Sequence, residues 1–128
     1  MNNESNYVYV YTRQQAIEDG IFVDVTERAK GIGFRIPVAI TTNLFSTYLK
    51  SYDEDKQKAE QETRKAVDNF LLKVRNLISI HKGKDSSTLL ELVVPFHNGE
   101  QVDVWVAIEA QSPDDPSPAM NVLLPSDY

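Results

Sequence analysis

The sequence predicts an α+β fold, in which a mixed or antiparallel sheet of four to six strands packs with one long amphipathic helix and short capped helices. Three observations lead to this class. Strand-like segments occur in both the first and the last third of the chain, a long run with helical periodicity separates them, and an Asn-Gly pair joins two apolar runs. With 128 residues and 41% hydrophobic composition, the chain is expected to form a single domain spanning residues 1–128.

The N-terminal part predicts short strands that alternate with short helices. Residues 1–6 are expected to be disordered, and residues 7–11 alternate Tyr and Val in a strand pattern. Thr12 and Gln15 have the spacing of a helix capping box, and Gly20 is placed to end that helix in the left-handed conformation.

Two further strands are predicted, over residues 21–25 and 34–40. Thr26 is expected to cap a short helix between them that runs through Lys30 and ends at the following glycines. Pro37 cannot donate a backbone hydrogen bond, which favours an edge strand or a strand start. Thr41 or Thr42 is then expected to cap another helix that runs to residue 50.

The longest element is a helix predicted over residues 53–82, because its apolar residues recur every three or four positions. Ser51 with Glu54, or Asp53 alone, is expected to start it. A hairpin follows, with strands over 88–96 and 101–110 around Asn98-Gly99.

The second hairpin strand alternates strictly, and its two faces differ. Val102, Val104, Val106 and Ile108 are expected to point one way, and Asp103, Trp105, Ala107 and Glu109 the other. Residues 112–119 predict an acidic, proline-rich loop, residues 120–125 a last strand, and the residues after them a free end.

The charge of the chain is unevenly distributed. The net charge is −6, and residues 86–128 carry seven acidic residues without a single Lys or Arg. Such a surface repels phosphate, which disfavours direct nucleic-acid binding. It favours either plain solubility or contact with a basic protein.

Several kinds of chemistry find no support in the sequence. The absence of cysteine excludes disulfides and thiolate chemistry, and His81 and His97 belong to no metal-binding pattern. Gly31 and Gly33 do not form a nucleotide loop, and no nucleophile motif is present. We therefore expect no metal, no cofactor and no enzymatic activity. Without a signal-like or membrane-spanning run, a cytoplasmic location is expected.

Two groups of residues are candidates for binding. Arg13, Asp24 and Arg35 predict either a structural ion pair or a small pocket for phosphate or carboxylate. The second group predicts a protein-contact surface, since tryptophan is enriched at interface hot spots. Its members are Trp105, Asp103, Glu109, Asp114 and Asp115.

The motif YTR-x-QAI-x-DG, followed by VDV and GFR-x-PVA, spans residues 11–39, and the chain ends in an acidic loop, an apolar strand and a Leu-Pro-acid finish. With these features the sequence resembles an uncharacterised family of small proteins carried by bacterial plasmids, phages and other mobile elements. The resemblance implies that the protein is encoded by such an element and functions as one of its proteins.

Two functions are consistent with these observations. The first is an interaction protein of a mobile element that binds a host protein through its acidic C-terminal third, one form being an inhibitor of a defence or restriction system. The alternative is a domain that senses or sequesters an anionic ligand or nucleotide through Arg13 and Arg35. Strand pairing at residues 7–11 would also permit a homodimer.

Overall fold

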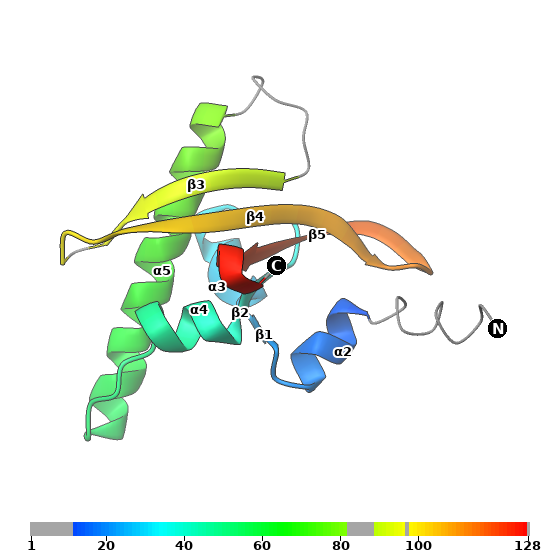
Figure 1. Cartoon of the computed structure of the whole chain (residues 1–128). Coiled ribbons are helices and arrows are strands. Elements are labelled where there is room, and N and C mark those ends of the chain that lie inside the picture. Colours follow the sequence, from blue (N-terminus) through cyan, green and yellow to red (C-terminus); the bar gives the residue numbers. More distant parts are fainter. Residues whose placement is uncertain (1–11, 82–88, 97, 128) are drawn as a thin grey trace.

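A five-stranded mixed sheet organises the chain in a computed structural model that describes residues 12–81, 89–96 and 98–127. The strand order is β1-β2-β5-β4-β3 (Figure 1). The strands are β1 (Phe22–Asp24), β2 (Val38–Thr41), β3 (Leu89–Pro95), β4 (Gln101–Ser112) and β5 (Asp115–Leu123). The helices are α2 (Arg13–Glu18), α3 (Thr26–Ile32), α4 (Thr42–Leu44), the π-helix η1 (Phe45–Leu49), α5 (Lys56–His81) and the 3₁₀-helix η2 (Pro125–Asp127). The α+β class and the expected number of strands are confirmed.

The pairing in the sheet is antiparallel except at one place. β1 pairs antiparallel with β2, and β3, β4 and β5 form successive antiparallel pairs. β5 then runs parallel to β2, with Ala39 opposite Asn121. The C-terminal strand therefore lies between the N-terminal strands and the hairpin, and it joins the two ends of the chain in one sheet.

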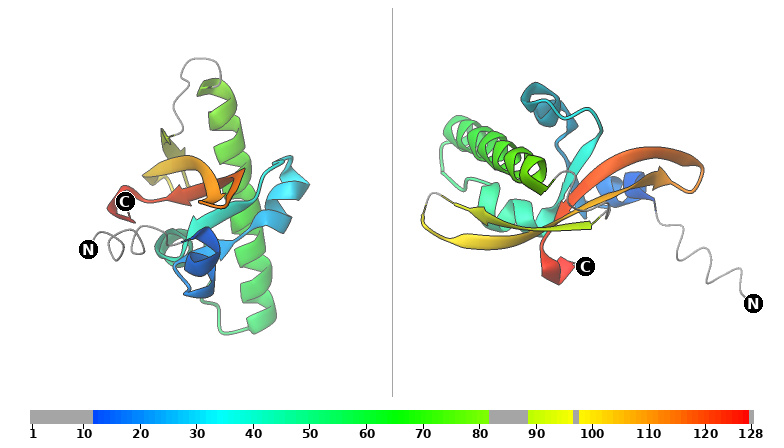
Figure 2. Two further views of the ribbon diagram at one scale, coloured as in Figure 1. Left: turned by 90° about the vertical axis from the view of Figure 1, so that its right-hand side faces the viewer. Right: turned by 90° about the horizontal axis from the view of Figure 1, so that it is seen from above.

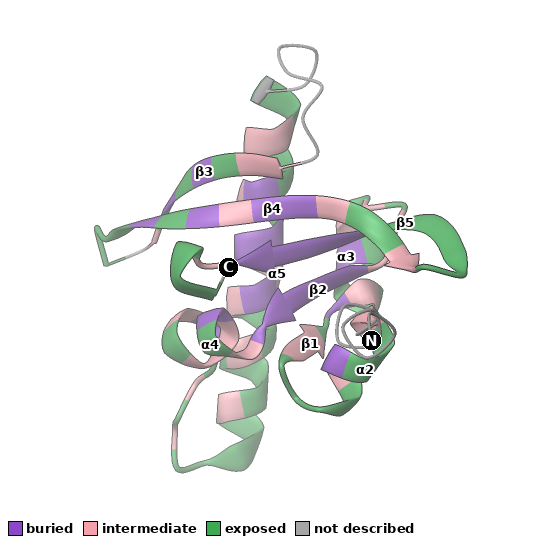
Figure 3. Cartoon of the chain, turned by 45° about the vertical axis from the view of Figure 1, so that its right-hand side comes forward, coloured by how far each residue is buried: buried purple, intermediate pink, exposed green. Residues whose placement is uncertain are grey.

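The core lies between α5 and one face of the sheet. Val67, Phe70, Leu71 and Val74 of α5 are buried against inward-facing side chains of the strands. Phe70 also stacks on Phe96, with ring centroids 6.0 Å apart. Figure 3 shows the buried residues concentrated on the strands and on the side of α5 that faces them. We call this the inner face of the sheet, and the side away from α5 the outer face.

The strict alternation predicted for the second hairpin strand is confirmed. The inward row is Val102, Val104 and Val106, all buried, and it lies opposite Val94, Leu92 and Leu90 of β3. Viewed from above in Figure 2, α5 and α3 lie on one side of the sheet and η2 on the other.

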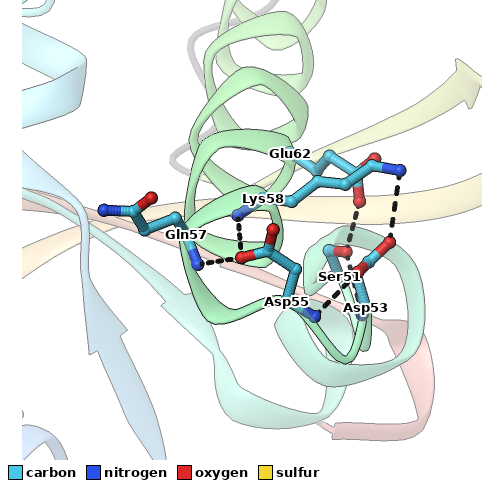
Figure 4. A network of polar contacts seen from close by, with 6 residues as sticks. All are labelled: Ser51, Asp53, Asp55, Gln57, Lys58 and Glu62. Atoms are coloured by element: carbon cyan, nitrogen blue, oxygen red, sulfur yellow. Dashed lines mark hydrogen bonds and ion pairs between the residues drawn. The ribbon is translucent and has the colours of Figure 1, made fainter.

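The start of α5 differs from the prediction. Asp55 caps the helix, because its carboxylate accepts from the backbone N–H groups of Gln57 (3.0 Å) and Lys58 (3.4 Å). The predicted caps, Ser51 and Asp53, instead brace the preceding turn. Ser51 donates to the Glu62 carboxylate at 2.6 Å, and Asp53 forms an ion pair with Lys58 (Figure 4).

The N-terminal helices follow the sequence signals closely, with one exception. The capping box between Thr12 and Gln15 is present, and Gly20 has a φ of +78°. Thr26 was wrongly expected to cap α3, because its hydroxyl donates to Asp24 and accepts from the Val38 N–H instead. The helix continues past Gly31 to Ile32, and Gly33, whose φ is +111°, is its C-cap.

Two predicted boundaries near the middle and the end of the chain were also wrong. The strand predicted over residues 34–40 begins only at Val38. It begins directly after Pro37, so the predicted strand start at the proline is confirmed, while the edge alternative does not hold because β2 is an interior strand. β4 and β5 extend through most of the predicted 112–119 loop and leave only Pro113 and Asp114 as the turn, because cross-strand pairing stabilises the proline-rich segment in extended form.

The C-terminal residues up to 127 form no free end. The Asp127 carboxylate accepts from Thr41, Asn43 and the backbone N–H of Leu124, and this anchors η2 to the end of β2. Residues 1–11, 82–88 and 97, with the predictions that fall on them, lie outside the described residues. Among the described helices, none combines the length and apolarity needed to cross a membrane.

Removal of the Phe70 side chain should destabilise the domain strongly. Phe70→Ala leaves a cavity between α5 and the sheet and is expected to lower the free energy of unfolding by about 3–5 kcal/mol. Leu72→Ala on the exposed side of the same helix is the control, with a loss of about 1 kcal/mol or less. Urea unfolding measures both, and equal losses would contradict the assigned packing.

The assignment of the α5 cap can be tested separately. Asp55→Ala removes the acceptor for two helix N–H groups and should lower the free energy of unfolding by about 1 kcal/mol. Asp55→Ser should retain most of the native free energy of unfolding, since serine also caps helices. A larger loss in Glu54→Ala than in Asp55→Ala would place the helix start elsewhere.

Candidate functional site

Arg13 is held in a fixed orientation at the outer face of the sheet. It is the first residue of α2, and its Nε donates to the Oδ1 atom of Asn121 at 3.1 Å. Asn121 lies in the interior strand β5 and is only 6% exposed. The Nη2 atom of Arg13 is buried and has no hydrogen-bond partner among the described residues. The guanidinium group therefore offers an unused donor in a shielded position.

Burial changes the electrostatics of this arginine. It lowers the pKa of Arg13, and the nearby Asp24 carboxylate partly offsets this by raising it. An arginine side chain remains protonated at neutral pH in either case. Arg13 is therefore a partly desolvated cation with a carboxylate in its vicinity.

Two clefts border Arg13. The first cleft has a volume of about 750 Å³ and is bounded by α2, β1, the start of α3, η1 and the first half of α5. Four basic side chains line it, those of Arg13, Arg28, Lys50 and Arg64. Its acidic lining residues are Asp24, Glu27 and Glu60.

The cations of the first cleft differ in how they are engaged. Arg28 makes a two-point contact with Asp68, in which its Nε donates to Oδ1 at 3.0 Å and its Nη2 to Oδ2, and this contact raises the pKa of Arg28. The Arg64 Nη2 atom lies 3.9 Å from the Glu60 Oε2 atom, and both side chains of this ion pair are largely exposed on the surface of α5. An exposed pair of that kind contributes little to stability, so Arg64 can change partner at small cost.

The second cleft lies on the outer face and has a volume of about 760 Å³. Among the described residues that line it, Arg13 is the only basic one, and Glu109 and Asp127 are the carboxylates. Asp127 is already engaged by Thr41 and Asn43. The charge of the second cleft therefore favours cations over anions.

The structure separates the predicted trio of Arg13, Asp24 and Arg35. Arg13 and Asp24 both line the first cleft, and the Asp24 Oδ1 atom accepts from the N–H and hydroxyl of Thr26. Arg35 is exposed in the loop before β2 and lines neither cleft. Asn121 was missed by the sequence analysis, although an amide within the apolar run 120–124 was the available signal.

A second candidate lies on the outer face of β3 and β4. Glu91 is paired with Trp105, and Val93 with Asp103, so these four side chains share one face. We call them the outer patch. Val93 is 50% exposed, Trp105 is partly buried, and both acids are exposed. The outer patch thus combines apolar surface with negative charge.

The remaining predicted contact residues lie at a distance from the outer patch. Asp114 and Asp115 form the tip of the β4–β5 hairpin, where the bonds from Ser117 lower the pKa of Asp115. Ser112 lies seven positions after Trp105 along β4, which corresponds to about 23 Å. Glu109 lies between the two and lines the second cleft.

The described residues contain no group of three or more His, Asp or Glu side chains arranged to hold a metal ion. The chain is an α+β domain in which a long helix packs on one face of a mixed sheet. The two clefts at Arg13 and the outer patch are its candidate binding sites. The chain belongs to a family of unknown function (DUF6573), which matches over residues 1–127. No curated protein and no solved structure gave a match.

The coupling between Arg13 and Asn121 can be measured with a double-mutant cycle. Asn121→Ala deprives the Arg13 Nε of its acceptor, but this penalty vanishes in the Arg13→Met background. A coupling free energy of about 1 kcal/mol is expected from urea unfolding. The matched cycle of Asn121→Ala with Arg28→Met should give a value near zero, since Arg28 bonds to Asp68. Equal coupling in the two cycles would contradict the assigned contact.

Proposed function

We propose that this protein is a non-enzymatic binding domain that recognises a basic protein surface through the outer patch. The observation that carries the proposal is the pairing of two exposed carboxylates, Glu91 and Asp103, with two apolar side chains, Val93 and Trp105, on one sheet face. Apolar side chains supply contact area, and the surrounding charge selects the partner.

Charge complementarity defines the chemistry of the partner. Residues 86–128, which include β3, β4 and β5, contain no Lys or Arg. A second copy of the same face would bring like charges together, and a phosphate backbone would be repelled. A surface rich in Lys or Arg with apolar side chains among them is the complement that remains.

Carriage on a mobile element would make a host protein the natural target of this surface. Inhibition of a defence or restriction system is one form of the proposal. The geometry favours a mixed apolar and acidic contact over imitation of DNA charge, because a DNA-like surface needs a denser array of acids than the outer patch provides. Binding of an anionic ligand, the alternative function, would use other residues.

The outer patch can be tested with Trp105, the only tryptophan of the chain, as the reporter. A synthetic peptide of alternating Lys and Leu serves as the basic, apolar probe. Binding should shift Trp105 emission to shorter wavelength and weaken as salt is added. The variant Glu91→Lys/Asp103→Lys should bind the peptide at least about tenfold more weakly, because it replaces attraction with repulsion.

The matched control is Glu54→Lys/Glu60→Lys, which changes the net charge by the same amount at the start of α5. It should reduce the affinity by much less than the outer-patch variant does. Equal weakening in both variants would show that only the overall charge matters. That result, or an unchanged Trp105 emission in the presence of bound peptide, would reject the outer patch as a binding surface.

A further inference from the structure

We propose that the first cleft binds a small molecule of nucleotide size whose oxyanion group, a phosphate or a carboxylate, accepts a hydrogen bond from the Nη2 atom of Arg13. This site is separate from the outer patch and uses none of its residues. The proposal rests on the unused donor, the charge of the cleft and the composition of its walls.

The unused donor is the first step of the argument. A buried polar group normally has a hydrogen-bond partner, because its desolvation is otherwise uncompensated. The Nη2 atom of Arg13 lacks one among the described residues, while the Nε atom of the same planar group is fixed by Asn121. The bond to Asn121 restrains the guanidinium plane, and an oxyanion that reaches Nη2 from the first cleft, which Arg13 also lines, would satisfy this donor.

The charge of the two clefts decides which of them receives the ligand. The first cleft is lined by four basic and three acidic side chains, and the second by one basic and two acidic side chains. Because Arg28 is already paired with Asp68, the other three cations of the first cleft balance its three carboxylates, whereas the described lining of the second cleft is net negative. An anion is therefore opposed less in the first cleft than in the second. Lys50 and Arg64 have exposed side chains at the first cleft, so they are available to a second oxyanion group of the ligand.

The walls of the first cleft also indicate an apolar part of the ligand. Val25 and Val67 are buried, Phe45 is partly buried, and all three line the cleft. Ligand sites commonly have volumes of about 300–1,000 Å³ and combine apolar walls with a few polar groups. A cleft of about 750 Å³ with an arginine at one side matches an anion attached to a ring or a short apolar chain.

Isothermal titration calorimetry of the full chain with AMP, pyrophosphate and citrate tests the proposal. AMP combines a phosphate with a ring. Pyrophosphate provides phosphate groups without a ring, and citrate provides carboxylates in place of phosphate. At least one probe should bind the native chain, and Arg13→Gln should weaken that binding by about tenfold or more. Arg35→Gln is the matched control, because it removes an exposed arginine outside both clefts and should leave the affinity unchanged.

Arg64→Gln provides a second variant that should fold normally, since its side chain lies on the exposed surface of α5. It should also weaken the binding of the same probe, whereas Glu91→Lys/Asp103→Lys should not. Absence of binding by all three probes at millimolar concentration would overturn the proposal. Equal losses in Arg13→Gln and Arg35→Gln would do so as well, because they would indicate a general charge effect.

Discussion

The parallel pairing of β2 with β5 is the constraint on which both the fold and the candidate sites depend. It joins residues 38–40 to residues 120–122, which are far apart in the sequence. This pairing places Asn121 in the interior of the sheet, where it reaches Arg13, and it directs the chain so that Asp127 meets Thr41. Without it, β1 and β2 would have no contact with the hairpin strands, and the first turns of the domain would lose their support.

Burial of α5 supplies the main stabilising free energy for this arrangement. The buried residues of α5 lie within its second and third quarters, and its first two turns are mostly exposed. Asp55 and the network around Ser51 hold those polar turns beside η1. One wall of the first cleft is therefore built from a helix segment whose position is set by caps and side-chain hydrogen bonds more than by apolar packing.

The two faces of the sheet have different roles in this arrangement. Most of the inner face is covered by α5, and the first cleft lies at the edge of this contact, between η1, α3 and the first half of α5. The outer face carries the outer patch at β3 and β4, the second cleft, and Asn121, which anchors Arg13. Asn121 is the polar residue within the buried run 119–123 of β5, and its side chain accepts the hydrogen bond from Arg13.

Local signals in the sequence determined the elements with short-range causes. The capping box at Thr12, the glycine at position 20, the Asn98-Gly99 turn and the alternation of β4 each depend on residues a few positions apart. Only the tertiary structure decided the extended form of residues 115–119, the separation of Arg13 from Arg35 and the role of Asn121. Those outcomes depend on which distant strands become neighbours, and that choice is made by burial of the whole core, which no short segment encodes.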